Sequence, residues 1–182
     1  MRLNYTFPNI PQIKDLTVEV ENLEGKLKTK VHGPKAFLYG PFLKLYFAHY
    51  NSKLIKPILQ REDGNIYSLY MPPIPSRAHV RHIETLLRNW FFKETRPLAV
   101  TLAVTSRCQL ACVHCSAASS GNAGPDLTRA EIEKVIRESV DLGVTNITFT
   151  GGEPLLRPDL EELVSMVARR DTVALVFTNA LA

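Results

Sequence analysis

The stretch LAVTLAVTSRCQLACVHC, residues 98–115, decides the fold of the second half of the chain. Its first part, residues 98–104, is a nearly continuous apolar run, the pattern of a strand buried on both faces in a parallel sheet. Its last part carries Cys108, Cys112 and Cys115. Because the chain has no other cysteine, we expect the three thiols to share one role, which is to hold iron.

Two helices are predicted after this stretch. Thr128 and Glu131 have the spacing of a capping box, and Gly143 suits the left-handed residue that ends a helix. A second helix fits residues 158–170, with Pro158 at an early helical position.

Three segments alternate with these helices and are predicted to be strands: residues 98–104, 145–150 and 172–178. The resulting order is β, loop, α, β, α, β, which predicts parallel strands joined by right-handed crossovers. The expected fold class is therefore α/β for residues 96–182, preceded by a small α+β region in residues 1–95.

The first 95 residues have a different pattern, with aromatic runs and proline breaks. Four features are predicted there: a hairpin over residues 13–31 that turns at Gly25, a packed helix starting near Pro41, two strands within residues 58–70 joined at Asp63-Gly64, and a helix from the N-cap Ser76 to Lys93. His79 and His82 are expected at the surface, because no cysteine or carboxylate cluster accompanies them. A precursor-peptide clamp and a structural extension are both open as roles for this region.

Charge is unevenly distributed along the chain. Residues 1–95 carry 14 Lys and Arg against 8 Asp and Glu, a net charge of +6, whereas residues 96–182 carry 8 against 10, a net charge of −2. The basic half is interpreted either as a solvated surface or as a dock for an acidic peptide, a nucleotide or a membrane face. No nucleic-acid module is recognisable, so no nucleic-acid partner is expected.

Composition also indicates the cellular compartment of the protein. The first ten residues have no apolar region or cleavage site of a secretory signal, and three clustered cysteines argue against a disulfide framework. A cytoplasmic location is predicted. Residues 35–50 are the most apolar run, but a bilayer needs about 20 apolar residues, so no transmembrane segment is expected. An interfacial membrane helix or a partner-docking face remains an alternative for this run.

The cysteine spacing limits which kind of metal centre the three thiols can hold. Thiolates suit zinc, copper and iron–sulfur clusters. A structural zinc site normally takes four ligands in two close pairs, and the one available addition, His114, abuts Cys115. Cubane clusters are commonly held by four cysteines, so three would leave one iron without a protein ligand.

Two motifs together resemble the radical S-adenosylmethionine superfamily. Cys108, Cys112 and Cys115 follow one predicted strand, and GGEP, residues 151–154, follows the next. The resemblance implies a 4Fe–4S cluster whose free iron chelates S-adenosylmethionine, and reductive cleavage that gives a 5′-deoxyadenosyl radical. The longer string FTGGEPLLRPDL is most like the subgroup that modifies peptides, haem precursors or ribosomally made cofactors.

The resemblance also implies roles for single residues. The three cysteines would bind the cluster, and His114 would lie near the adenine. Gly151 and Gly152 would let the backbone approach the methionine part of the cofactor, and Glu153 would hold its ammonium group. Asn179, in FTNA, matches the asparagine of a TNG turn of the family. In this chain Ala180 replaces the glycine of that turn. Arg157 also fits the family string. An equally open interpretation is that Arg157 is only a surface arginine beside a helix.

The resemblance implies a partial (β/α)6 barrel of the TIM type, of which residues 96–182 would be the N-terminal half. The chain is therefore expected to be a fragment of a longer enzyme. Expected partners are a reductant such as flavodoxin or ferredoxin, and a peptide or cofactor-precursor substrate. The alternatives left open are a non-catalytic iron–sulfur or electron-transfer module and a scaffold protein.

Overall fold

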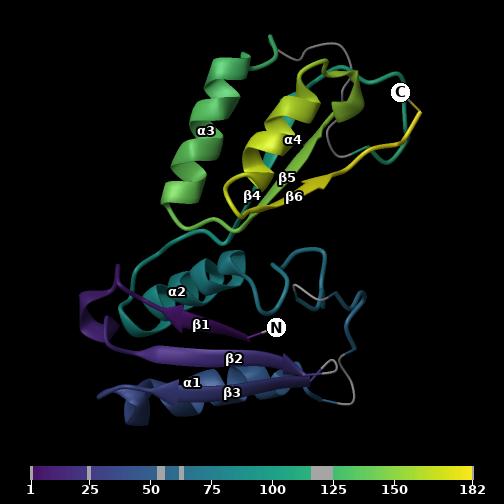
Figure 1. Cartoon of the computed structure of the whole chain (residues 1–182). Coiled ribbons are helices and arrows are strands. Elements are labelled where there is room, and N and C mark those ends of the chain that lie inside the picture. The colour runs from purple at the N-terminus through teal and green to yellow at the C-terminus, as the bar shows by residue number, and fades with distance from the viewer. Residues whose placement is uncertain (1, 24–25, 53–55, 62–63, 116–124, 182) are drawn as a thin grey trace. The chain divides into compact units, whose positions relative to one another are not determined.

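The computed structural model describes residues 2–23, 26–52, 56–61, 64–115 and 125–181. The chain divides into two compact units, Met1–Arg96 and Pro97–Ala182, and each is described by itself. Both units are drawn in Figure 1.

Unit 1 is built on an antiparallel three-stranded sheet. Its strands are β1 (Arg2–Thr6), β2 (Thr17–Leu23) and β3 (Lys26–His32), in the order β1-β2-β3. The short helix η1 (Pro11–Ile13) lies between β1 and β2 in the chain. The β2–β3 pair confirms the predicted hairpin, although its turn at Gly25 lies outside the described residues.

Helix α1 (Ala36–His49) begins earlier than predicted. The expected start near Pro41 is wrong, because Pro41 lies inside the helix. The first turn is held by bonds from Ala36 N to Gly33 O and from Tyr39 N to Lys35 O, at 3.0 and 3.2 Å. Burial of Tyr39 in the core then favours helix ahead of the proline.

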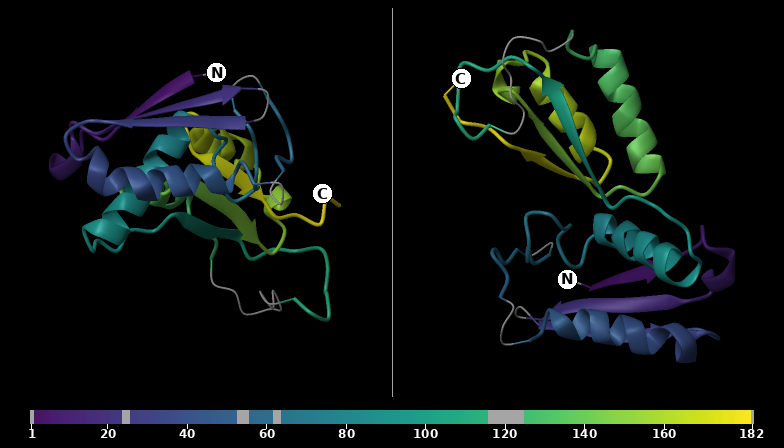
Figure 2. Two further views of the ribbon diagram at one scale, coloured as in Figure 1. Left: turned by 90° about the horizontal axis from the view of Figure 1, so that it is seen from below. Right: turned by 180° about the vertical axis from the view of Figure 1, so that it is seen from behind.

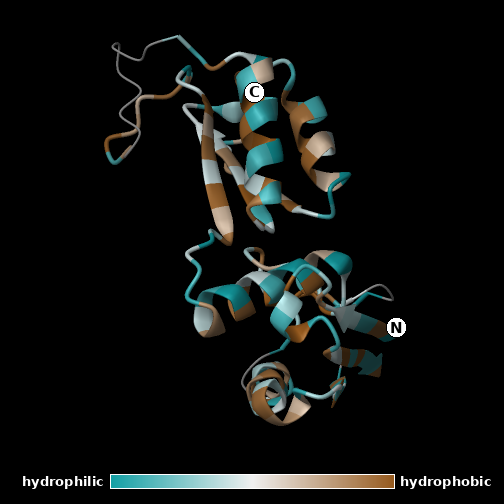
Figure 3. Cartoon of the chain, turned by 90° about the vertical axis from the view of Figure 1, so that its left-hand side faces the viewer, coloured by the Kyte–Doolittle hydropathy of each residue, from teal (hydrophilic) through white to brown (hydrophobic). Residues whose placement is uncertain are grey.

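Helix α1, seen along its axis in Figure 3, carries apolar residues on its exposed face as well as on its buried one. Phe37, Leu38 and Leu45 are 80%, 53% and 73% exposed. An apolar pocket of about 590 Å³ adjoins it, lined by Phe42, Leu45, Tyr46, Ala48, His49, Tyr50 and Trp90. Among the described residues, no helix is long and apolar enough to cross a membrane. An interfacial or docking role for this face stays a prediction.

The described residues of the segment after α1 form no extended hairpin. Their pairing is confined to single bridges, Leu59 with Ile66 and Asn65 with Ile74, so the two strands predicted within residues 58–70 are wrong. Asn65 exchanges both backbone bonds with Ile74, at 2.8 and 2.9 Å, which draws this segment toward the proline-rich connector. The predicted turn residue Asp63 lies outside the described residues.

Helix α2 (Arg77–Phe91) confirms the predicted N-cap, since the Ser76 hydroxyl accepts a bond from His79 N at 3.1 Å. The surface prediction for His79 and His82 is wrong, because they are 0% and 8% exposed. Hydroxyl groups provide the partners that sequence did not reveal. Tyr5 Oη lies 2.8 Å from His79 Nδ1, and Tyr46 Oη lies 3.0 Å from His79 Nε2.

Unit 2 is an α/β unit with a parallel sheet in the order β4-β5-β6. Its elements are β4 (Ala99–Thr105), α3 (Arg129–Asp141), β5 (Asn146–Gly151), η2 (Pro154–Leu156), α4 (Leu160–Ala168) and β6 (Val173–Val176). This order confirms the predicted alternation, and the described residues form no closed barrel. Helix α4 is shorter than the predicted 158–170, and Pro158 precedes it.

Helices α3 and α4 cover one face of this sheet, and the other face is open in the right-hand view of Figure 2. Crossovers of the same hand between successive neighbouring strands place both helices on one side. The prediction that β4 is buried on both faces is therefore wrong, since Ala99, Thr101 and Ala103 are exposed. The core lies beneath the helices and includes Val104, Ile132, Ile136, Ile147, Phe149, Leu163 and Val167.

The structure confirms the residues predicted to begin and end helix α3. Thr128 Oγ1 accepts a bond from Glu131 N, and the Glu131 carboxylate accepts one from Thr128 N at 2.8 Å, which completes the capping box. Gly143 follows the helix with a φ of 101°. These local bonds fix where the chain enters α3 from the cysteine loop.

Candidate functional site

The predicted site residues follow the carboxyl ends of the three parallel strands, which meet at one edge of a sheet. Cys108 follows β4, Gly152 follows β5 and Asn179 follows β6. The side-chain amide of Gln109, in the cysteine loop, donates to Asn179 Oδ1 at 3.3 Å. All three strand ends therefore contribute to one region.

The glycine pair packs directly against the backbone that precedes Cys108. Gly152 N donates to Thr105 O at 2.8 Å, and Glu153 N donates to Arg107 O at 2.7 Å. A Cβ at Gly151 would lie 2.1 Å from Thr105 O, and one at Gly152 would lie 2.2 Å from Arg107 O. Gly151 also has a φ of +143°. Glycine is required at both positions for this contact, whatever else approaches them.

Glu153 is buried, at 1% exposure, and holds the end of β6. Its Oε1 accepts bonds from Leu155 N at 2.9 Å and Thr178 Oγ1 at 2.7 Å, and its Oε2 accepts one from Asn179 N at 2.8 Å. Burial raises the pKa of Glu153, but these hydrogen bonds outweigh it and hold the pKa below its usual value. Glu153 is thus an ionised carboxylate at neutral pH.

The three thiols lie on one loop and are free of disulfides. Cys108 is half-buried, and Cys112 and Cys115 are exposed. Cys115 N donates to Cys112 O at 3.1 Å, which forms a turn between the second and third thiols. Within the described part of the chain, no group of three or more His, Cys, Asp or Glu is gathered as a metal site. Three accessible thiols on one loop nevertheless suit a soft metal centre.

His114 and Asn179 differ in how far the structure anchors them. His114 is exposed beside Cys115. Asn179 is tied to Glu153 through its backbone N–H, and its Oδ1 also accepts a bond from Leu181 N at 2.9 Å. Ala180 has a φ of 58°, a conformation that glycine adopts without strain. A glycine would avoid this strain, so Ala180 adopts the turn at some conformational cost.

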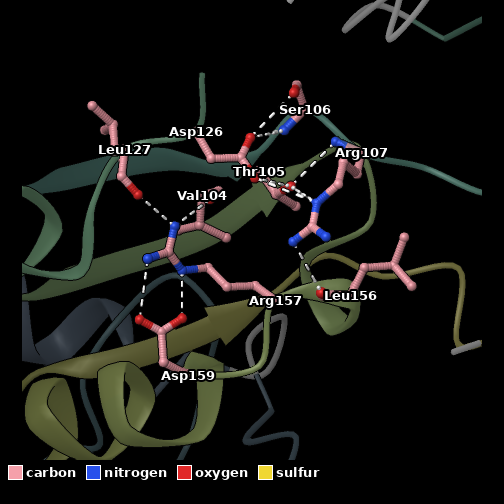
Figure 4. A network of polar contacts seen from close by, with 9 residues as sticks. All are labelled: Val104, Thr105, Ser106, Arg107, Asp126, Leu127, Leu156, Arg157 and Asp159. Carbon is pink, nitrogen blue, oxygen red and sulfur yellow. Dashed lines mark hydrogen bonds and ion pairs between the residues drawn. The ribbon is translucent and has the colours of Figure 1, made fainter. Parts of the chain in front are cut away.

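Sequence reasoning missed Asp126 and left Arg157 undecided. Figure 4 shows both in a polar network at the end of β4. Arg157 is only 9% exposed and donates to two backbone carbonyls, so the surface interpretation is wrong. A lone aspartate after a small-residue loop gave no specific signal in the sequence.

Comparisons with known proteins match the part of the chain that carries these motifs. The model of the radical SAM superfamily matches residues 102–181. A probable GTP 3′,8-cyclase of Methanopyrus kandleri is 35% identical over 95 residues, which are 52% of this chain and 30% of that protein. A PqqA peptide cyclase of Bradyrhizobium diazoefficiens is 46% identical over 69 residues, which are 37% of this chain and 18% of that protein. The chain thus spans less than a third of the length of either relative. The cysteine loop and the GGE turn lie at neighbouring strand ends within this match, and residues 102–181 are thus similar to the radical SAM superfamily.

Proposed function

We propose that unit 2 is the N-terminal half of a partial (β/α)6 barrel that binds a 4Fe–4S cluster and S-adenosylmethionine. When bound, the cluster supplies the electron that cleaves the cofactor and yields a 5′-deoxyadenosyl radical. The observation that carries the proposal is the pair of backbone bonds from Gly152 and Glu153 to Thr105 and Arg107. These bonds hold the GGE turn against the backbone just before Cys108, which supports one shared site for the two motifs.

In this proposal Cys108, Cys112 and Cys115 hold the cluster as thiolates. Three thiolates would leave one iron of a cubane without a protein ligand, a position that S-adenosylmethionine could occupy. The exposure of Cys112 and Cys115 favours cluster insertion from solvent and electron delivery by a reductant such as flavodoxin or ferredoxin. Free thiols also favour a reducing compartment such as the cytoplasm.

The methionine part of the cofactor would lie beside the GGE turn. Glu153 is ionised, and each carboxylate oxygen can accept about two hydrogen bonds. Its Oε2 accepts one bond from Asn179 N and has a further lone pair, but the side chain is 1% exposed, so the ammonium group of the cofactor would have to displace part of its cover to reach it. Gly151 and Gly152 keep side-chain bulk away from this edge. His114 is assigned to contact the adenine of the cofactor. Asn179, in the turn after β6, is assigned to contact the cofactor as well.

We assign a peptide or a cofactor precursor as the substrate class. Two observations support this assignment: relatives carry the names PqqA peptide cyclase and GTP 3′,8-cyclase, and the string FTGGEPLLRPDL resembles the same subgroup. The radical would abstract a hydrogen atom from that substrate. Because the chain spans less than a third of these relatives, the activity of the whole enzyme is part of the proposal.

Anaerobic reconstitution with iron and sulfide tests the proposal. The wild-type chain should take up a 4Fe–4S cluster whose electron paramagnetic resonance spectrum, after reduction, shifts when S-adenosylmethionine is added. Cys112→Ala should lose the cluster, whereas the control Leu110→Ala, in the same loop, should retain it. A cluster whose spectrum does not change when S-adenosylmethionine is added would instead indicate an electron-transfer module. Full iron loading of Cys112→Ala would contradict the ligand assignment.

A further inference from the structure

The cysteine loop has a closed base. Its first arm leaves β4 at Val104–Ser106, and its second arm enters α3 at Asp126–Leu127. Side chains bridge the two arms at adjacent points, as Figure 4 shows. All three cysteines lie between these arms.

Asp126 forms the first bridge. Its Oδ2 accepts a bond from Thr105 Oγ1 at 2.7 Å, and its Oδ1 accepts bonds from Ser106 N at 2.8 Å and Ser106 Oγ at 3.1 Å. Arg107 Nε lies 3.5 Å from Oδ2. Hydrogen bonds from Thr105 and Ser106 also hold the pKa of Asp126 below its usual value, so the bridging group is a carboxylate.

Arg157 forms the second bridge. Its Nη1 donates to Val104 O and to Leu127 O, both at 2.8 Å, so one nitrogen joins the two arms. Asp159 holds the guanidinium in place by accepting bonds from Nε at 2.6 Å and Nη2 at 3.1 Å. Lysine has one nitrogen and no planar fork, so it cannot make these four bonds in the same geometry.

We infer that Asp126 and Arg157 are positioning residues that close the base of the cysteine loop and thereby hold the three thiols ready for the cluster. The inference rests on the proposed function. Bringing the two ends of a loop together costs entropy, and the two bridges offset that cost before any metal binds. Gly152 and Glu153 bind the same first arm from its other side, so the bridges also set the cysteine loop relative to the GGE turn.

The test uses the full chain and matched variants. Asp126→Ala removes the carboxylate, Asp126→Asn keeps the shape and some acceptor capacity, and Arg157→Lys keeps only the charge. The controls are Asp141→Asn and Arg169→Lys, at exposed positions of the same unit. Circular dichroism checks that every variant is folded. The readouts are the rate at which a chelator removes iron from the reconstituted cluster, and amide hydrogen exchange of residues 104–106 and 126–128 in the metal-free chain.

Asp126→Ala and Arg157→Lys should release iron about tenfold faster than wild type, the change expected when a hydrogen bond to a charged group is lost. Asp126→Asn should lie between wild type and Asp126→Ala, and both controls should match wild type. Faster exchange at both arms in the metal-free variants supports the inference even if the wild-type cluster ignores S-adenosylmethionine, which would overturn the proposed function alone. Iron release and exchange equal to those of the controls would overturn the inference and leave the proposed function standing.

Discussion

At the scale of single residues, the buried histidines make the stability of unit 1 depend on pH. Burial and the neighbouring His82 hold the pKa of His79 well below its usual value, and burial lowers the pKa of His82 to about 4. Both side chains are therefore neutral in the folded chain and become protonated near pH 6.5 when it unfolds. Because the unfolded chain binds more protons, this stability is present above about pH 6.5 and is lost as the pH falls toward 4.

The loss of stability can be followed by urea unfolding, with Trp90 fluorescence as the probe. At about 1.4 kcal/mol for each pKa unit, His82 alone should lower the free energy of unfolding by about 3 kcal/mol between pH 6.5 and 4. His82→Gln should flatten this dependence, whereas His49→Gln, at an exposed position, should leave it unchanged. An unfolding midpoint that stays constant over this range would contradict the assignment of neutral, buried histidines.

Gly152 offers a second prediction at the residue scale. Gly152→Ala places a Cβ 2.2 Å from the backbone oxygen of Arg107. Since backbone cannot move aside cheaply, we expect a loss of about 3 kcal/mol in the free energy of unfolding of unit 2. Gly143→Ala is the comparison, because there the positive φ of 101° is the conformational cost and about 1 kcal/mol should be lost. Circular dichroism during urea unfolding measures both, and equal losses would show that the close approach to Arg107 is unimportant.

At the scale of elements, the capping box of α3 fixes the end of the cysteine loop. Thr128→Ala removes the acceptor for Glu131 N, which should lower the free energy of unfolding of unit 2 by about 1 kcal/mol. Ser165→Ala, at an exposed position inside α4, should change it by less than about 0.5 kcal/mol. Urea unfolding followed by circular dichroism compares the two variants. A loss of equal size in both would mean that the cap contributes nothing specific.

The elements that sequence predicted well are those with signals at their own ends. Ser76 and Thr128 accept hydrogen bonds from backbone N–H groups three residues on, and Gly143 ends a helix. The local sequence is therefore enough to predict these helix ends. The start of α1 was mispredicted because Tyr39 gains its stabilisation from the distant core, which outweighs the local preference around Pro41. The same reasoning applies to residues 58–70, where Asn65 pairs with Ile74 beyond the apparent turn.

The candidate site divides in the same way. Cysteine spacing and the GGE turn are local, so both could be found from the sequence, and both lie within residues 102–181, which the family model matches. Asp126 and Arg157 act on the backbone of Val104–Ser106 and Leu127, and such partners have no sequence signature. His79 was misplaced for a similar reason, because its partners Tyr5 and Tyr46 lie far away in the chain.

At the scale of the whole molecule, each unit buries a core of its own. The core of unit 1 joins β-strands to α1 and α2 and includes Tyr5, Phe7, Val18, Leu43, Phe47, Ile83 and Leu87. The core of unit 2 lies between its sheet and two helices. Since hydrophobic burial is the main driving force for folding, two separate cores predict two separate unfolding transitions.

Trp90 makes this prediction measurable, because it is the single tryptophan of the chain and belongs to unit 1. A shortened chain of residues 1–96 should unfold in urea with the fluorescence midpoint of the full chain, to within about 0.5 kcal/mol in free energy. In the full chain, Gly152→Ala should lower the circular dichroism transition of unit 2 and leave the Trp90 midpoint unchanged. If the shortened chain lacked a cooperative transition, or if Gly152→Ala shifted the Trp90 midpoint, the two cores would be energetically coupled. Independent transitions would instead mean that unit 1 can be studied by itself for peptide or surface binding, without the cluster.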